Sequence, residues 1–197
     1  MINGGSRSAV FLDRDGVLNA SVATDKGAAR APWTLDEVDV WLQHQPAVND
    51  LAEMGWLVVV VSNQPDVSRG FLLEEDARTI NAFITDQFPG IADSYLCTHT
   101  GADGCSCRKP LPGMLFAAAE EWHIDLSSSW MVGDRWVDIA AGAAAGCRTV
   151  LIEHTHSWEA TSQGSPPLDL TPDYRVSDLT EAVRVIMWES FGIKRIR

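Results

Sequence analysis

Short apolar runs alternate with segments that carry helix signals, and this alternation limits the possible folds more than any other feature of the chain. The runs lie near residues 8–13, 57–62, 94–98, 129–133 and 148–153, and the helical segments near 46–54, 74–87, 112–122, 135–145 and 178–190. Strands separated by helices of this length form parallel sheets with right-handed crossovers. The pattern predicts an α/β fold, a Rossmann-like three-layer sandwich with a central parallel sheet.

Valine, proline and glycine residues support these assignments. Val58 to Val61 form a continuous apolar run, which is typical of a central strand buried on both faces. Pro46 and Pro112 suit the first turn of a helix, where a missing N–H group is tolerated. Gly55 and Gly146 suit helix C-termini.

The length of 197 residues suits one domain spanning residues 1–197. Two segments interrupt the alternation: residues 19–40, and residues 154–173, which are rich in Ser, Thr, Pro and Gly. Neither is long enough to be a second domain. We therefore expect no separate cap domain, so that only a loop covers the active site.

The formal net charge of −12 disfavours nucleic acid and anionic membranes as partners. An anionic substrate would therefore need a locally cationic pocket. No run approaches the ~18 apolar residues of a membrane span, and the polar start, Met1 to Ser8, shows no signal peptide. We expect a monomeric, cytoplasmic protein.

The first apolar run ends in Asp13-Arg14-Asp15-Gly16. In an open α/β sheet, ligands bind at the carboxyl ends of the strands. Asp13 is a candidate nucleophile that would form an acyl-phosphate, and Asp15 is a candidate general acid and base. Gly16 would let the backbone turn sharply beside the phosphate. The alternative is that this motif forms only a turn or a helix cap.

Ser62, Asn63 and Gln64 follow the second apolar run. The Ser62 hydroxyl is a candidate for holding the transferring phosphoryl oxygens, and Asn63 and Gln64 are candidates for substrate binding. Arg69, on the following loop, suits a second anionic group of the substrate. An ordinary turn and a solvated arginine are the alternatives.

Arg108 and Lys109 precede the helix near Pro112. We expect Lys109 to neutralise charge on the phosphoryl group and the nucleophile, and Arg108 to reach a more distant phosphate or hydroxyl of the substrate. Asp134, at the end of the fourth apolar run, is a hard oxygen ligand suited to Mg²⁺ together with Asp13.

The main-chain carbonyl of Asp15 is the expected third Mg²⁺ ligand. Asp138 lies one helical turn beyond Asp134. It is expected to orient Lys109 or a metal-bound water, or else only to favour the helix N-terminus.

A second metal motif lies at residues 97–107. Cys97, His99, Cys105 and Cys107 supply three thiolates and one imidazole, a complete tetrahedral set for zinc. Four protein ligands leave no open position, so the site is expected to be structural and to hold the loop that delivers Arg108. Three reduced cysteines without a metal are the alternative.

Taken together, four segments resemble the haloacid dehalogenase-like phosphatases. These are Phe-Leu-Asp-Arg-Asp-Gly at 11–16, Ser-Asn-Gln at 62–64, the Cys/His motif running into Arg-Lys-Pro-Leu-Pro-Gly-Met at 108–114, and Met-Val-Gly-Asp at 131–134. The resemblance is to the capless, zinc-containing branch, which holds the D-glycero-D-manno-heptose-1,7-bisphosphate 7-phosphatases and the histidinol-phosphatases.

The resemblance implies a Mg²⁺-dependent phosphomonoesterase with an aspartyl-phosphate at Asp13 and a small phosphorylated metabolite as substrate. The segments at 108–114 and 68–71 look more like the heptose bisphosphatases, whereas the short spacer between His99 and Cys105 also occurs in histidinol-phosphatases. We therefore expect removal of the 7-phosphate from the sugar bisphosphate, with histidinol-phosphate hydrolysis as the alternative. A non-catalytic zinc-stabilised binding module is the second alternative.

Overall fold

A six-stranded parallel sheet forms the centre of the computed structural model, which describes residues 7–24 and 29–192. The strand order is β5-β4-β1-β6-β7-β8. The strands are β1 (Ala9–Leu12), β4 (Leu57–Asn63), β5 (Ile91–Cys97), β6 (Trp130–Gly133), β7 (Arg148–Ile152) and β8 (Tyr174–Val176). The predicted parallel sheet is confirmed. The edge strand β8 lies outside all five predicted strand segments.

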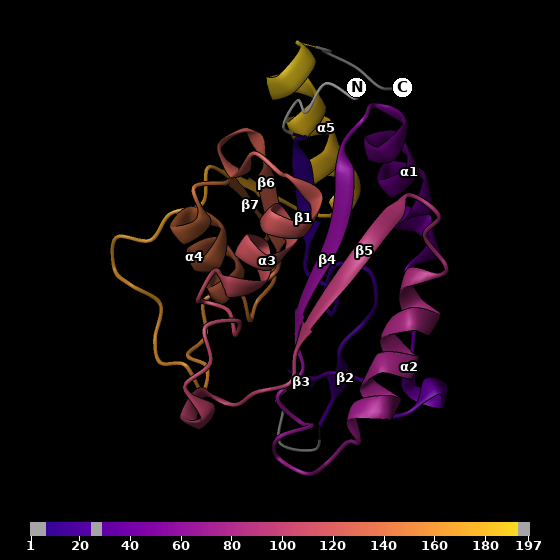
Figure 1. Ribbon diagram of the computed structural model, residues 1–197, viewed down its shortest axis with the longest axis vertical. Coiled ribbons are helices and arrows are strands. Elements are labelled where there is room, and N and C mark those ends of the chain that lie inside the picture. Colours follow the sequence, from indigo (N-terminus) through magenta and orange to yellow (C-terminus); the bar gives the residue numbers. More distant parts are fainter. Residues whose placement is uncertain (1–6, 25–28, 193–197) are drawn as a thin grey trace.

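Helices cover both faces of the sheet and complete the predicted three layers (Figure 1). They are α1 (Gln45–Glu53), α2 (Glu74–Thr85), α3 (Gly113–Trp122), α4 (Trp136–Ala145) and α5 (Leu179–Phe191). Pro46 lies in the first turn of α1 as predicted, whereas Pro112 is the N-cap of α3 and lies just before its first turn. Gly146 caps α4 with a φ of 84°, in agreement with the prediction.

The alternation of side chains along the central strands produces two cores. Val10 and Leu12 of β1 pack with α1, α2 and α5 on one face, whereas Ala9 and Phe11 pack with α3 on the other. Val58 to Val61 of β4 alternate in the same way and are all fully buried. A strand with apolar side chains on both faces is stable only between two covering layers.

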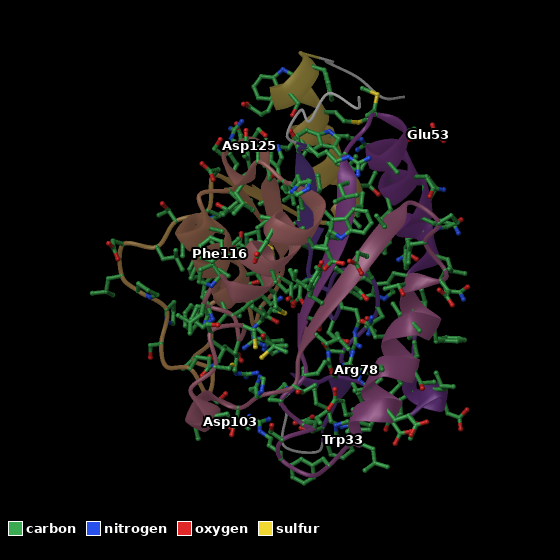
Figure 2. The ribbon with its side chains drawn as sticks, viewed as in Figure 1. Trp33, Glu53, Arg78, Asp103, Phe116 and Asp125 are labelled. Carbon is green, nitrogen blue, oxygen red and sulfur yellow. The ribbon has the colours of Figure 1, made fainter. Side chains whose placement is uncertain are left out.

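The long connection between β1 and α1 lies at the carboxyl end of the sheet. It contains the hairpin β2 (Val22–Ala23) and β3 (Ala29–Arg30) and two 3₁₀ turns, Leu35–Glu37 and Leu42–His44. Figure 2 shows Trp33 of this connection at the same end of the molecule as Asp103, opposite Glu53. Two further 3₁₀ turns are Gly101–Asp103 and Leu126–Ser128. In the part of the chain that the structure describes, no helix is long and apolar enough to cross a membrane.

Candidate active site

A pocket of about 480 Å³ opens at the carboxyl end of the sheet. This size is typical of small-molecule sites. The pocket brings together most of the polar residues that were predicted from separate segments: Asp13, Asp15, Ser62, Asn63, Arg69, Arg108, Lys109 and Asp134. They meet because the carboxyl ends of β1, β4 and β6 are neighbours in a parallel sheet.

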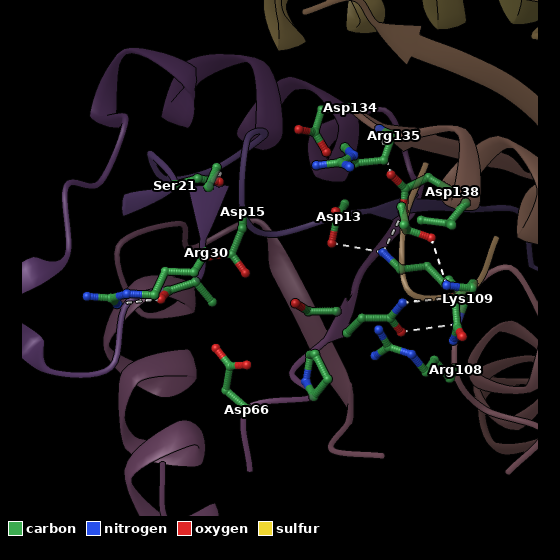
Figure 3. A pocket seen from close by; sticks show the side chains of 18 of the residues that line it. Asp13, Asp15, Ser21, Arg30, Asp66, Arg108, Lys109, Asp134, Arg135 and Asp138 are labelled. Carbon is green, nitrogen blue, oxygen red and sulfur yellow. Dashed lines mark hydrogen bonds and ion pairs between the residues drawn. The ribbon is translucent and has the colours of Figure 1, made fainter. Parts of the chain in front are cut away.

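Lys109 is the central cation of the pocket, although its side chain is only 1% exposed (Figure 3). Its Nζ lies 2.8 Å from Asp13 Oδ1 and 2.6 Å from Asp138 Oδ1, and it donates to the Val61 carbonyl at 2.7 Å. Burial lowers the pKa of Lys109, but the two carboxylates raise it by a larger amount. The pKa of Lys109 therefore lies above its ordinary value. The lysine therefore stays protonated beside Asp13.

Burial also controls the titration of the predicted nucleophile. It raises the pKa of Asp13 to about 7, and the charge of Lys109 opposes this rise. Asp13 Oδ1 additionally accepts the backbone N–H of Arg14 at 2.8 Å. The carboxylate form of Asp13 thus depends on the positive charge that the pocket supplies.

Asp138 contacts Lys109, as the first of its predicted roles requires, and it also caps the N-terminus of α4, as the alternative predicted. One of its oxygens contacts the Lys109 ammonium group and the other accepts the backbone N–H of Arg135 at 2.9 Å. Asp138 is fully buried. A Cβ at position 133 would lie 2.3 Å from the Asp138 Cβ, so Gly133 is what permits this close approach.

Asp13, Asp134 and Asp138 place carboxylate oxygens within 4.8 Å of one another. Asp134 Oδ1 is buried and has no hydrogen-bond partner among the described residues. Burial, together with the charges of Asp13 and Asp138, holds the pKa of Asp134 well above its usual range. Clustered hard oxygen atoms of this kind fit a Mg²⁺ ion. The Asp15 carboxylate lies outside the cluster, so the predicted role of Asp15 in metal binding rests on its main-chain carbonyl.

Gly16 is required by two features of this cluster. Its φ is +87°, a conformation that side chains disfavour. In addition, a Cβ at this position would lie 2.3 Å from Asp134 Oδ2. The glycine of the Asp-x-Asp-Gly motif therefore makes room for the third acidic residue.

Asp15 is held by side chains from two segments. Arg14 Nη2 donates to both of its oxygens at 3.0 Å, and Asn19 Nδ2 donates to Oδ1 at 2.9 Å. Gln64 Nε2 donates to Asp15 Oδ2 and to Ser62 Oγ, both at 2.8 Å. The structure thus joins the predicted proton donor to the predicted phosphoryl-binding hydroxyl through one amide group.

Gln64 was predicted to bind substrate, but the structure places its side chain behind the pocket lining. The Gln64 side chain is 1% exposed and does not line the pocket, and its amide nitrogen holds Asp15 and Ser62 in position. Asn63 lines the pocket, but its amide also exchanges two hydrogen bonds with the backbone of Lys109, at 2.9 and 3.1 Å. Strand-end amides in sequence do not reveal whether they face a ligand or a neighbouring backbone.

Arg108 is buried, with 6% of its surface exposed, and its partners in the described contacts are neutral. It donates to the His99 carbonyl at 3.1 Å and to Ser162 Oγ at 3.4 Å. Burial lowers its pKa. Arg69 lines the same pocket but is paired with Asp66 at 3.0 Å.

Thr161 and Gln163 also line the pocket, although neither was among the predicted site residues. They belong to the segment at residues 154–173, whose Ser-, Thr-, Pro- and Gly-rich composition predicts only a surface loop. The segment is fixed to α4 by the Trp136 backbone N–H, which donates to the Ser157 carbonyl at 2.9 Å, and by the indole Nε1, which donates to the Glu159 carbonyl. Serine- and glycine-rich composition gives no signal for such a contact.

The residues of the Cys/His motif also come together. The ligand atoms of Cys97, His99, Cys105 and Cys107 all lie within 4.8 Å of one another. Cys97 Sγ is 3.2 Å from Cys107 Sγ and 3.8 Å from Cys105 Sγ, and His99 Nδ1 is 3.3 Å from Cys107 Sγ. Tetrahedral zinc with bonds of ~2.3 Å separates sulfur atoms by about 3.8 Å, so the cluster has the dimensions of a zinc site.

Comparison with known proteins shows that this chain is similar to phosphatases. The HAD-hydrolase-like family model matches residues 106–182. D-glycero-beta-D-manno-heptose-1,7-bisphosphate 7-phosphatase of Pseudomonas aeruginosa is 36% identical over 152 residues, which are 75% of this chain and 82% of the relative. The Pseudomonas putida protein of the same name is 33% identical over 83% of this chain and 93% of its own.

Solved structures give the same result. The D,D-heptose 1,7-bisphosphate phosphatase of B. bronchiseptica, complexed with magnesium and phosphate, is 28% identical and superposes with a TM-score of 0.74. The alignment covers 93% of this chain and 99% of that protein. A putative HAD-like phosphatase of Mesorhizobium loti is 27% identical, with a TM-score of 0.67 over 92% of this chain and 88% of its own.

Proposed function

Because the chain belongs to the haloacid dehalogenase-like hydrolases and is a phosphatase, we propose that its substrate is D-glycero-D-manno-heptose 1,7-bisphosphate and that it removes the 7-phosphate. One observation carries the choice of a bisphosphate. The pocket that holds Asp13 and Lys109 also contains Arg108, a buried cation without a carboxylate partner in the described contacts. A buried arginine of this kind is suited to a second phosphate group.

The proposed reaction proceeds in two displacements. A carboxylate oxygen of Asp13 attacks phosphorus, the bond between phosphorus and the sugar oxygen breaks, and Asp15 gives that oxygen a proton. Asp15 then takes a proton from water, which attacks phosphorus and releases phosphate and Asp13. Lys109 and Ser62 stabilise the charge on the phosphoryl oxygens.

Asp13, Asp134 and the main-chain carbonyl of Asp15 would hold the Mg²⁺ ion. When bound, the ion supplies positive charge to the transferring phosphoryl group. Asp134 Oδ1, which has no hydrogen-bond partner in the described part of the chain, supports this assignment. Monomeric state and cytoplasmic location stay predictions from the sequence.

The substrate assignment is tested by measuring phosphate release from the heptose bisphosphate and from histidinol phosphate, side by side, with Mg²⁺. We expect a strong preference in kcat/KM for the bisphosphate. Phosphorus NMR of the sugar product should show that the remaining phosphate group is the one at C1. A preference for histidinol phosphate would keep the two-step chemistry and overturn the substrate. A failure to hydrolyse any phosphomonoester would favour the non-catalytic binding module.

Replacing Arg108 with Gln should raise KM for the heptose bisphosphate by about 10-fold or more, because a hydrogen bond to a charged group contributes ~1.5–3 kcal/mol. Glycerol 3-phosphate has only the reacting phosphate, so its KM should change less than about threefold. The matched control is Arg78→Gln, at an exposed arginine on α2. Equal effects on both substrates would contradict a second phosphate site at Arg108.

We also propose that the Cys/His cluster binds zinc and serves as a structural site. Cys107 directly precedes Arg108 and Lys109, so the metal would fix the start of the segment that enters the pocket. Its four ligands would leave no coordination position for substrate.

Chelation of zinc, followed by restoration of Mg²⁺, should lower kcat/KM and speed amide hydrogen exchange in residues 97–110, but not around Asp13. Cys105→Ser should reproduce both effects. Cys147→Ala is the matched control, since Cys147 is a buried thiol outside the cluster. Zinc-free protein with unchanged kinetics and melting temperature would contradict the structural role.

A further inference from the structure

One end of the pocket is formed by an aromatic wall that the reaction steps do not use. The wall consists of Arg30, Trp33 and Phe71, all of which line the pocket. The Trp33 and Phe71 rings are stacked, with centroids 5.3 Å apart and planes inclined by 13°, and the Arg30 guanidinium carbon lies 3.9 Å from the Trp33 ring centroid. Figure 3 shows Arg30 on the opposite side of the pocket from Lys109.

Two carboxylates hold this wall in place. Glu37 accepts hydrogen bonds from both Nη atoms of Arg30, at 2.8 and 2.6 Å, and from the Trp33 backbone N–H at 2.8 Å. The bonds to Arg30 lower the pKa of Glu37 to about 2, so it stays ionised. Asp66, which is 7% exposed, accepts from Trp33 Nε1 at 2.7 Å and from Arg69 Nη1 at 3.0 Å. The wall is therefore held in place by hydrogen bonds within the protein.

Phe71 and Arg69 are the parts of this region that a ligand can still engage. Phe71 is 61% exposed although it lines the pocket, whereas both Nη atoms of Arg30 are already bound to Glu37. Arg69 is 40% exposed and is held by Asp66 through Nη1. An exposed aromatic ring on a fixed support, beside a cation, is suited to a ligand with an apolar face and an anionic or hydroxyl substituent.

We propose that Phe71, supported by Trp33, packs against the sugar ring of the leaving group and thereby determines specificity, with Arg69 facing a substituent of that ring. The inference rests on the proposed function, because it requires a cyclic sugar phosphate. It assigns Phe71 to ground-state binding of the sugar, at a distance from the groups that act on phosphorus. Its removal should therefore change KM and not kcat.

The experiment compares Phe71→Leu, Phe71→Tyr and Leu73→Ala with the wild type, using the heptose bisphosphate as substrate and inorganic phosphate as a product inhibitor. Leu73 is a matched control, since it is 71% exposed near Phe71 but does not line the pocket. We expect Phe71→Leu to raise KM several-fold, up to about 10-fold, with kcat within about twofold. Phe71→Tyr and Leu73→Ala should stay within twofold of wild-type KM.

The inhibition constant of inorganic phosphate should be the same in all four proteins, because inorganic phosphate lacks the sugar ring that Phe71 would contact. The inference is overturned by an unchanged KM in Phe71→Leu, by an equal rise in Leu73→Ala, or by a parallel rise in the inhibition constant of phosphate. Wild-type protein that does not hydrolyse the heptose bisphosphate overturns the proposed function and this inference together. Turnover with an unaffected Phe71→Leu variant overturns only the inference.

Discussion

Asp13→Asn should lower kcat by a factor on the order of 10⁴ or more, because an amide cannot form the acyl-phosphate. The fold should be preserved. The Asp13 carboxylate is buried near Asp134 and Asp138, and burial raises its pKa to about 7. A carboxyl whose folded pKa is raised destabilises the folded state when it is ionised, so removing its charge at pH 8 should leave the melting temperature unchanged or higher.

The measurement is steady-state phosphate release with Mg²⁺, together with a thermal melt at pH 8 in the absence of Mg²⁺. Asp86→Asn is the matched control, since Asp86 is an exposed residue at the end of α2. It should keep wild-type activity. Appreciable turnover by Asp13→Asn would contradict the role of Asp13 as nucleophile. Loss of the folded state in this variant would instead show that Asp13 is needed for folding.

Lys109→Met should cause the second large effect, a loss of both activity and stability. The substitution leaves the buried Asp13 and Asp138 without their shared cation, and breaking such a pair costs about 3–5 kcal/mol. It also removes the charge that stabilises the phosphoryl group, so kcat should fall by roughly 10²–10³-fold or more. Denaturant unfolding in the absence of Mg²⁺ and steady-state kinetics in its presence measure the two effects.

Two further variants separate these contributions. Arg78→Met removes an exposed ion pair to Glu74 and should cost less than ~1 kcal/mol. Adding Asp138→Asn to Lys109→Met should recover part of the stability, because one unpaired buried charge is removed, but none of the activity. A stability loss no larger than that of Arg78→Met, or wild-type kcat, would contradict the central role of Lys109.

The main elements of the fold were predictable because their signals are local. The valine run Val58 to Val61 predicts a strand, and proline and glycine residues predict where helices begin and end. Each of these signals concerns only a few consecutive residues. By contrast, β8 (Tyr174–Val176) has only three residues, and it pairs with β7 partly because Asp173 accepts hydrogen bonds from Thr149. That contact depends on tertiary structure, which no local pattern encodes.

The same distinction applies to the site. Asp13, Ser62 and Asp134 were identifiable because residues at the ends of neighbouring parallel strands must meet. The positioning role of Gln64 was not, since it depends on the direction of one side chain. The stacking of Trp33 on Phe71 joins two loops, and neither loop has a periodic pattern that would predict the contact.

The proposed aspartyl-phosphate at Asp13 can be detected by trapping it during turnover. Wild-type protein turning over the heptose bisphosphate with Mg²⁺ is quenched with borohydride, which reduces an aspartyl-phosphate to homoserine, and position 13 is examined by peptide mass spectrometry. We expect homoserine at position 13 with the heptose bisphosphate and none without substrate. Homoserine at the position of another aspartate, or an unmodified Asp13 during full turnover, would contradict the role of Asp13 as the nucleophile.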